Sequence, residues 1–419
     1  MDSSIENGHQ DLEWAIKLNR ISLEVLGLWP KVEEVPREKL KRNLHVLAIL
    51  LLFVFGVLFP CIHSLIKTHE DIMIVIEHLQ GILPIITCVV RIIVFWWKKE
   101  VCFSDILEDV IPIISMITED WLKSRDVQEK KVMITWAQKS RIIVISSYIV
   151  MGVTSVCGVL LPIFGISPTH GVNINDTEKM FPLRVYYFYD VTKSPQYELT
   201  YISLSIGILF AAITYTGIDN FLGLLVFHIC GQIDILSTRL IYLNKFVKFH
   251  NSLKNCVWNH TRLLRAIAVI EDTYNKMLLA LFLYFGILFA FYGFLIINLV
   301  EERNYLSVTR ILILICLVIT ILVHMALYCA VGEVLIIQCD RMYHAICSQK
   351  WYNLDSKKAK NLILLLIRTK VSCYITAGKV FPMTMSTFCN QKMIIKTMYR
   401  NPELILNVVK LVVLISSLQ

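Results

Sequence analysis

The stretch LHVLAILLLFVFGVLFPCIHSL, residues 44–65, is the first of several apolar segments that decide the fold. It contains no Asp, Glu, Lys or Arg, and it is long enough for an α-helix to cross the hydrocarbon core of a membrane, which takes about 20 residues. Comparable segments follow at 72–97, 140–164, 200–228, 277–300 and 311–338. The sequence therefore predicts an all-α membrane protein.

The composition of the 419-residue chain agrees with this interpretation. Apolar side chains make up 56% of it and charged ones 18%, against about 45–50% and 25% in soluble domains. A soluble enzyme of this composition would expose too much apolar surface, and a mean hydropathy of +0.61 excludes a disordered chain. The net charge of +8 is interpreted as a guide to membrane orientation rather than as a nucleic-acid site.

A weaker seventh span begins near Val371. It carries Lys379 and is interrupted by Pro382. A later apolar piece at 404–418 contains Lys410 and is short for a span. No internal repeat is found, which argues against an inverted-repeat transporter. The sequence thus predicts seven transmembrane helices.

The distribution of basic residues predicts the orientation. Lys and Arg gather before span one and after spans two, four and six, and they are sparse in the other connections. The positive-inside rule places the N-terminus in the cytoplasm, so seven spans place the C-terminus outside, the reverse of a G-protein-coupled receptor. The loop at 165–196 is then external. It offers Asn175 as a glycosylation acceptor, and it lacks the cysteine that a G-protein-coupled receptor usually has there, whereas a second acceptor sequence at Asn259 falls on the cytoplasmic side.

Amphipathic helices are predicted in the cytoplasmic segments. Apolar residues recur at spacings of three and four over 233–247 and 263–274, which continues spans four and five beyond the membrane. A third pattern at 362–366 leads toward span seven, and residues 14–26 predict a helix at the inner membrane surface. We expect a cytoplasmic helical layer that either joins subunits or closes the monomer. The predicted parts are a cytoplasmic N-terminal segment, spans one to six, an anchor helix, the start of span seven and a tail, at 1–42, 43–338, 339–370, 371–390 and 391–419.

The sequence offers no enzymatic chemistry. It has no phosphate-binding glycine loop, no His-Glu-x-x-His and no Gly-x-Ser-x-Gly, and its His and Cys residues show no metal-ligand spacing. We therefore expect no enzyme, no metal and no cofactor.

Charged residues inside the spans are costly and need an explanation. Arg91, Asp219 and Glu333 lie toward the cytoplasmic ends of spans two, four and six, where they could pair with one another. An ion pair that serves packing or assembly is favoured over a permeation or proton-relay role. His324, near the middle of span six, is interpreted as a hydrogen-bonded core histidine rather than a ligand.

The outer halves of spans two to six predict a ligand pocket. They carry almost no charge but contain aromatic and small polar side chains, including a stripe of Phe282, Phe285, Phe289 and Tyr292. Such a pocket suits a small, uncharged, hydrophobic ligand, although packing between helices explains any single residue equally well. The candidate ligand-binding residues are His78, Tyr148, Ser155, Tyr201, Phe291 and Tyr292.

The chain resembles the insect odorant receptor family, and in particular receptors of Hymenoptera. The resemblance covers residues 11–390 and is most specific in NLDSKKAKNLILLLIRTKVSCYITAGKVFPMTMSTFCN, residues 353–390. It is also found in DLEWAIKLNRISLEVLGLWP (11–30), LRVYYFYDVTKSPQYELTY (183–201), DNFLGLLVFHICGQ (219–232) and GEVLIIQCDRMYHAICSQKWY (332–352).

The resemblance implies a ligand-gated, non-selective cation channel in the plasma membrane of an olfactory sensory neuron dendrite. Four subunits would surround one pore, and a tuning receptor of this kind would assemble with the odorant receptor co-receptor as a hetero-tetramer. The cytosolic helices would form the anchor between subunits, and the pocket would take a small volatile or cuticular hydrophobic ligand. Membrane lipid is the other expected partner, and nucleic acid is not expected.

The tail departs from the family pattern. After Asn390 the family usually continues through a short apolar helix, but this chain adds Lys392, Lys396, Arg400 and Pro402. A cationic lining would repel the ions of a cation channel, and proline breaks a helix. No pore residue is therefore assigned.

Two other receptor classes are weighed as alternatives. A gustatory receptor of the same fold is the nearer one, and the block WYNLDSKKAKN at 351–361 favours the odorant branch. A G-protein-coupled receptor is opposed by the charge bias, by the missing loop cysteine and by the absence of Asp-Arg-Tyr after span three.

Overall fold

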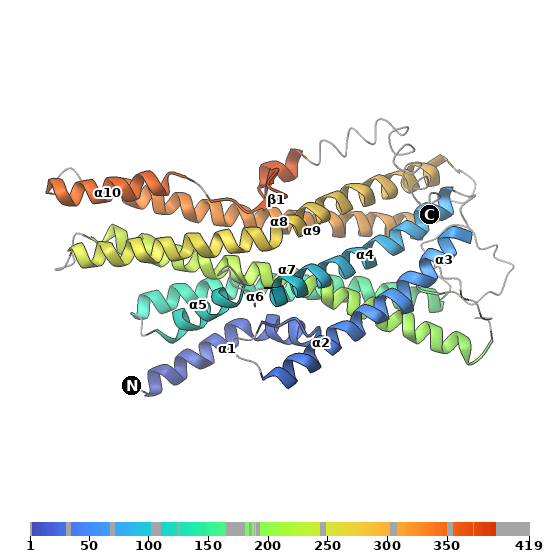
Figure 1. The fold of residues 1–419 in the computed structure, drawn as a ribbon. Helices are drawn as coiled ribbons and strands as arrows, with labels where there is room; N and C mark the ends of the chain where they lie inside the picture. The colour runs from blue at the N-terminus through green and yellow to red at the C-terminus, as the bar shows by residue number, and fades with distance from the viewer. Residues whose placement is uncertain are drawn as a thin grey trace.

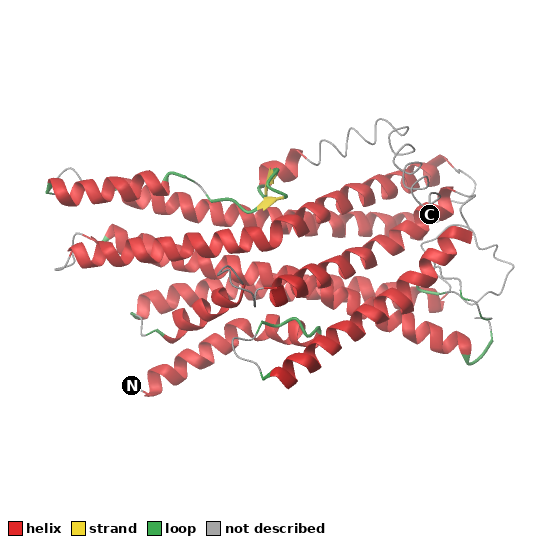
Figure 2. Ribbon diagram, in the orientation of Figure 1, coloured by secondary structure: helices red, strands yellow, loops and turns green. Residues whose placement is uncertain are grey.

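The computed structural model describes residues 2–30, 35–67, 72–101, 110–123, 126–164, 181–183, 187, 189, 193–243, 249–301, 308–349, 355–371 and 373–390. These residues form a bundle of long helices with one small hairpin (Figures 1 and 2). The helices and strands are α1 (Asp2–Val25), α2 (Pro36–Leu51), η1 (Leu52–Leu58), α3 (Phe59–Lys67), α4 (Ile72–Val101), α5 (Val110–Leu122), α6 (Val127–Leu160), η2 (Leu161–Phe164), α7 (Gln196–Ile241), α8 (Phe249–Glu301), α9 (Val308–Cys347), α10 (Ser356–Thr369), β1 (Thr376–Ala377) and β2 (Phe381–Pro382).

Among the described residues, six helical stretches are long and apolar enough to cross a membrane, and they coincide with the six strong predicted spans. The first combines α2, the π-helical turn η1 and α3, and the others lie in α4, α6, α7, α8 and α9. Local signals explain where two of them begin. Pro36 opens α2, at a position where its missing N–H costs nothing. The side chain of Asp126 accepts a hydrogen bond from the backbone N–H of Val127 at the start of α6.

α7 lies at the centre of the bundle and packs against α1, α4, α6, α8 and α9. Between Thr214 and Ser237 nearly every side chain is buried, so this half of the helix is enclosed on all sides. The helix ends beside the segment after α9, where the side-chain amide of Gln349 donates hydrogen bonds to the carbonyls of Leu240 and Ile241. These two bonds satisfy carbonyls that have no partner within the helix.

The predicted helical extensions of spans four and five are confirmed as helix, except that α7 ends at Ile241 and residues 244–248 lie outside the described residues. α7 and α8 continue without a break through the segments 233–241 and 263–274, and α10 covers the third predicted pattern. α10 lies toward the same end of the bundle as α1 and α5 (Figure 1). The helix α5 has no counterpart in the sequence prediction, although the buried side chains of Ile113, Ile117 and Trp121 show helical spacing.

The N-terminal helix α1 packs on protein. Leu12, Ala15 and Leu23 are buried, and the helix contacts α5, α6 and α7. The expectation of a helix is therefore correct, and neighbouring helices cover part of its apolar side, whereas Trp14 and Ile21 remain exposed. Burial of the covered side chains supplies the free energy that holds α1 in place.

The segment predicted as the start of span seven differs from the expectation. Helix begins at residue 385 rather than near Val371, because β1 and β2 form an antiparallel hairpin first. Its turn uses Gly378 and Lys379, both with positive φ, of 64° and 59°. Such backbone angles are incompatible with a continuing right-handed helix. Asn175, the apolar piece at 404–418 and the whole tail after Asn390 lie outside the described residues.

Candidate functional site

A cavity of about 310 Å³ lies among α4, α6, α7, α8 and α9. Pro182 and Leu183, from the connection between α6 and α7, complete its wall. At about 30 Å³ for each water-sized group, it holds a molecule of roughly ten non-hydrogen atoms. No described Asp, Glu, Lys or Arg lines it, so the cavity suits an uncharged molecule.

Small residues open the cavity and aromatic residues shape it. Gly158, Ala211 and Ala212 leave the space on α6 and α7. Gly81 on α4 allows the close approach of Leu183, whose Cδ2 would lie only 3.1 Å from a Cβ at that glycine. The aromatic part of the wall comes from Tyr215, Tyr284, Phe285 and Tyr292.

The polar wall includes His324 on α9. Its Nδ1 lies 2.8 Å from the carbonyl oxygen of Thr320, one helical turn away. Its ring meets that of Tyr215 edge to face, with centroids 5.6 Å apart. Gln80 on α4 and the hydroxyls of Thr154 and Thr320 lie in the same wall.

The sequence placed six residues in a ligand pocket, and the structure brings two of them together there. Ser155 on α6 and Tyr292 on α8 line the cavity. Phe285, from the predicted aromatic stripe, lines it as well, whereas Phe282 and Phe289 are buried in the core without lining it.

The remaining four candidates do not line the cavity. Phe291 is fully buried in the core. His78 lies 3.4 Å from the hydroxyl of Ser64, in the contact between α4 and α3. The hydroxyl of Tyr201 donates to the carbonyl of Val159. Tyr148 sits beside Gly217, at the contact of α6 with α7.

The sequence did not predict that Tyr215, Tyr284 and His324 line the cavity. Tyr215 and Tyr284 look like ordinary aromatic residues of their own spans, and only the packing of five helices brings them into one wall with His324. The histidine was the one visible signal, since a polar ring in the middle of an apolar span needs a partner.

An ion pair lies directly next to the cavity. The guanidinium of Arg91 is 3.0 Å from the carboxylate of Asp219, and their side chains are 5% and 17% exposed. Arg91 also donates to the hydroxyl of Tyr328 and to the carbonyl of Tyr215, at 3.1 and 3.3 Å. Its guanidinium carbon lies 4.4 Å from the centre of the Tyr215 ring, so this tyrosine joins the pair to the cavity wall.

The third predicted charge lies elsewhere. The Glu333 carboxylate accepts a hydrogen bond from the backbone N–H of Met385 at 3.2 Å. It therefore contacts the start of the last described helix rather than the pair formed by Arg91 and Asp219.

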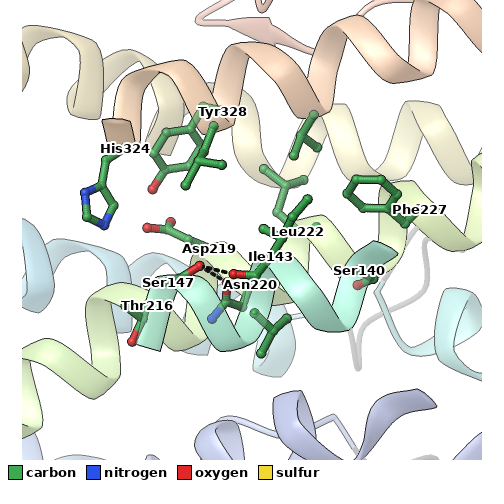
Figure 3. A pocket seen from close by; sticks show the side chains of 14 residues that line it. Ser140, Ile143, Ser147, Thr216, Asp219, Asn220, Leu222, Phe227, His324 and Tyr328 are labelled. Atoms are coloured by element: carbon green, nitrogen blue, oxygen red, sulfur yellow. Dashed lines mark hydrogen bonds between the residues drawn. The ribbon is translucent and has the colours of Figure 1, made fainter. Parts of the chain in front are cut away.

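A second, smaller cavity of about 40 Å³ lies between α6, α7 and α9. Its polar wall includes Asp219, Asn220 and His324, and Figure 3 shows the histidine ring pointing from α9 toward α7. The hydroxyl of Ser147 donates to the side-chain oxygen of Asn220 at 3.0 Å (Figure 3). His324 thus belongs to the walls of both cavities. Among the described residues, no group of three His, Cys, Asp or Glu side chains is arranged to hold a metal ion.

The sequence profile described as "7tm Odorant receptor" matches residues 71–399. The chain belongs to the odorant receptor family. No curated protein matches the chain. The match is to the odorant branch, which the block at 351–361 favoured.

Solved structures show the same fold. The receptor is similar to insect olfactory receptor OR5 from Machilis hrabei in complex with eugenol, with a TM-score of 0.77 and 17% identity over 96% of this chain and 100% of that one. A second structure of OR5 from Machilis hrabei gives a TM-score of 0.75 and 17% identity, covering 92% of this chain and 96% of that one. With its six apolar helices, this odorant receptor is a multi-pass membrane protein.

Proposed function

We propose that this odorant receptor binds a small, uncharged, hydrophobic molecule in the cavity among α4, α6, α7, α8 and α9, and that binding opens a non-selective cation pathway. The pathway is formed as a hetero-tetramer with the odorant receptor co-receptor, in the plasma membrane of an olfactory sensory neuron dendrite. The observation that carries the proposal is the uncharged 310 Å³ cavity within an odorant receptor fold. The related OR5 structure in complex with eugenol supports a small ligand.

The proposed orientation has the N-terminus in the cytoplasm and the C-terminus outside. The distribution of Lys and Arg supports it. The cavity then faces the outer half of the membrane, and α1, α5 and α10 lie on the cytoplasmic side. Epitope tags at each terminus, probed on intact cells, test this arrangement. An accessible N-terminal tag overturns it, and a hidden C-terminal tag means that the tail does not cross.

The proposed cytoplasmic layer also provides the contact between subunits. Leu364 and Ile367 on α10 are 59% and 62% exposed, although both are apolar. Apolar side chains left in water favour a partner, and a second subunit of the same fold fits this position.

Currents recorded from cells that express the receptor with and without the co-receptor test the function. We expect a panel of uncharged odorants to evoke a cation current only when both subunits are present. Ala212→Phe fills the cavity and removes the response, whereas Leu209→Phe, on the same helix at a position that is 44% exposed and outside the cavity, leaves it unchanged. A response that survives Ala212→Phe for every ligand, or the absence of any current, contradicts the proposal.

A further inference from the structure

The tautomer of the neutral His324 ring follows from its contacts. A backbone carbonyl can only accept a hydrogen bond, so the Nδ1 atom, 2.8 Å from the carbonyl of Thr320, carries the proton. In the neutral ring the other nitrogen, Nε2, is then an acceptor. It is buried and has no hydrogen-bond partner among the described residues, and the whole residue is 8% exposed. A buried acceptor without a partner is costly, which favours a ligand that supplies one.

Two threonine hydroxyls in the cavity wall likewise offer only an acceptor to a ligand. The hydroxyls of Thr154 and Thr320 donate to the carbonyls of Val150 and Cys316 in their own helices, at 3.0 and 2.8 Å. The oxygen atoms of both hydroxyls can therefore only accept a further hydrogen bond. The tyrosine hydroxyls in the wall can donate or accept, so they do not discriminate between ligands.

The described wall also holds groups that can donate, namely the hydroxyl of Ser155 and the side-chain amide of Gln80. The amide nitrogen of Gln80 on α4 has no hydrogen-bond partner among the described residues. A hydroxyl group can both donate and accept, so it is able to pair with either His324 or Gln80. Ethers, esters and ketones can only accept, and they leave the histidine nitrogen unpaired.

We propose that this receptor is tuned to ligands that carry a hydrogen-bond donor, namely alcohols or phenols of about ten non-hydrogen atoms, and that His324 Nε2 accepts the hydrogen bond from the ligand hydroxyl. This inference rests on the proposed function, because it places the ligand in the same cavity. His324 is then the residue that determines specificity, while the apolar and aromatic wall holds the carbon skeleton.

Isomeric ligand pairs test the inference on the purified receptor. The pairs are n-nonanol with methyl n-octyl ether, and para-propylphenol with para-ethylanisole. Within each pair the atoms are the same and only the donor differs. Ligand-induced thermal stabilisation measures binding directly, without requiring ion flow. We expect each hydroxyl compound to stabilise the wild-type receptor at a concentration at least about tenfold lower than its ether.

Variants at His324 assign the effect. His324→Leu removes the acceptor, so the alcohol and the ether of each pair should then stabilise the receptor at the same concentration. Stabilisation by the ethers should be unchanged. His324→Gln places a polar group near the position of Nε2 and should keep part of the preference. If His324→Leu does not fold, the comparison of alcohol with ether on the wild-type receptor tests the preference for a donor by itself.

The outcomes separate this inference from the proposed function. Equal stabilisation by alcohol and ether overturns the inference, and it is the result expected if a water molecule in the smaller cavity pairs with Nε2. Stabilisation by alcohols without any current overturns the proposed gating but leaves the ligand class in place. A receptor that binds neither member of either pair overturns the proposed ligand cavity, and the inference with it.

Discussion

The guanidinium of Arg91 on α4 lies 3.0 Å from the carboxylate of Asp219 on α7, with exposed fractions of 5% and 17%. Because Arg91 also bonds to Tyr328 on α9, one guanidinium connects three helices beside the proposed ligand cavity. A buried ion pair of this kind fixes the relative positions of the helices more than it raises the free energy of unfolding, because both charges lose their hydration on burial.

Removal of one partner should therefore damage the receptor more than removal of both. We expect Asp219→Asn to lower the free energy of unfolding by about 3–5 kcal/mol, because Arg91 stays charged and buried. The double variant Arg91→Met with Asp219→Leu should lose less. Melting temperatures of the purified receptor measure both. Lys358→Ala, at an exposed pair with Asp355, is the control and should change nothing measurable. A double variant that melts lower than Asp219→Asn contradicts this account.

Gly332 on α9 allows the segment after the hairpin to press against the helix. A Cβ at this position would overlap the carbonyl oxygen of Met383, so the backbone must move to accept one. We expect Gly332→Ala to cost about 1–3 kcal/mol and to disturb the helix that starts at residue 385. Gly286→Ala is the matched control, since nothing lies within 4 Å of its Cβ, and it should stabilise α8 slightly. Equal melting temperatures for the two variants would exclude a role for this contact.

Asp120 on α5 holds that helix to the bundle. Its carboxylate lies 3.2 Å from Nε2 of His228 and 2.5 Å from the guanidinium of Arg262. Burial works to raise the pKa of the carboxyl, but the hydrogen bonds and charges of His228 and Arg262 outweigh it and hold the pKa below its ordinary value. Because the folded pKa is lower than the unfolded one, about 3.9, this stabilisation is present above that pH and is lost as the pH falls through the folded value.

Asp120→Asn should thus lower the free energy of unfolding at neutral pH by about 1–3 kcal/mol, which is measured as a lower melting temperature. The difference from wild type should shrink below about pH 4. Glu119→Gln is the control on the neighbouring residue. Its side chain is 73% exposed and 3.9 Å from Arg262, so we expect no change. A gap between wild type and Asp120→Asn that is the same at both pH values would refute the assignment.

Glycosylation reports the proposed orientation independently of the tags. Asn175 lies in the connection that we place outside the cell, so Asn175→Gln should abolish a glycosidase-sensitive mobility shift on a gel. Asn259→Gln should leave the shift intact, because Asn259 lies within α8 on the proposed cytoplasmic side. A shift that depends on Asn259 reverses the orientation.

Much of the fold was predictable because its signals are local. Long apolar runs and residue spacings of three and four mark the six strong spans and the extensions of α7 and α8. The hairpin before residue 385 was not predictable in this way. Its apolar composition resembles a span, and the positive φ angles of Gly378 and Lys379 depend on contacts with α8, where the Gly378 N–H donates to the carbonyl of Asn275.

The cavity was less predictable than the spans. Its wall depends on how far each helix is rotated, and neighbouring residues on a helix point about 100° apart. For this reason Tyr292 lines the cavity while Phe291, one position away, is buried in the core. His324 could be recognised as unusual, but the partner that it meets on α7 comes from a segment about a hundred positions away.

The unbroken length of α7 has a mechanical consequence. At about 1.5 Å per residue, its 46 residues form a rod of roughly 70 Å. One part of it carries Ala211 and Tyr215 in the cavity wall, and its far end is held by Gln349. A continuous helix curves only gently, so a small tilt at the cavity is not absorbed along the way. We therefore expect that a ligand which tilts α7 at the cavity also moves its far end, with the Arg91–Asp219 pair between the two regions.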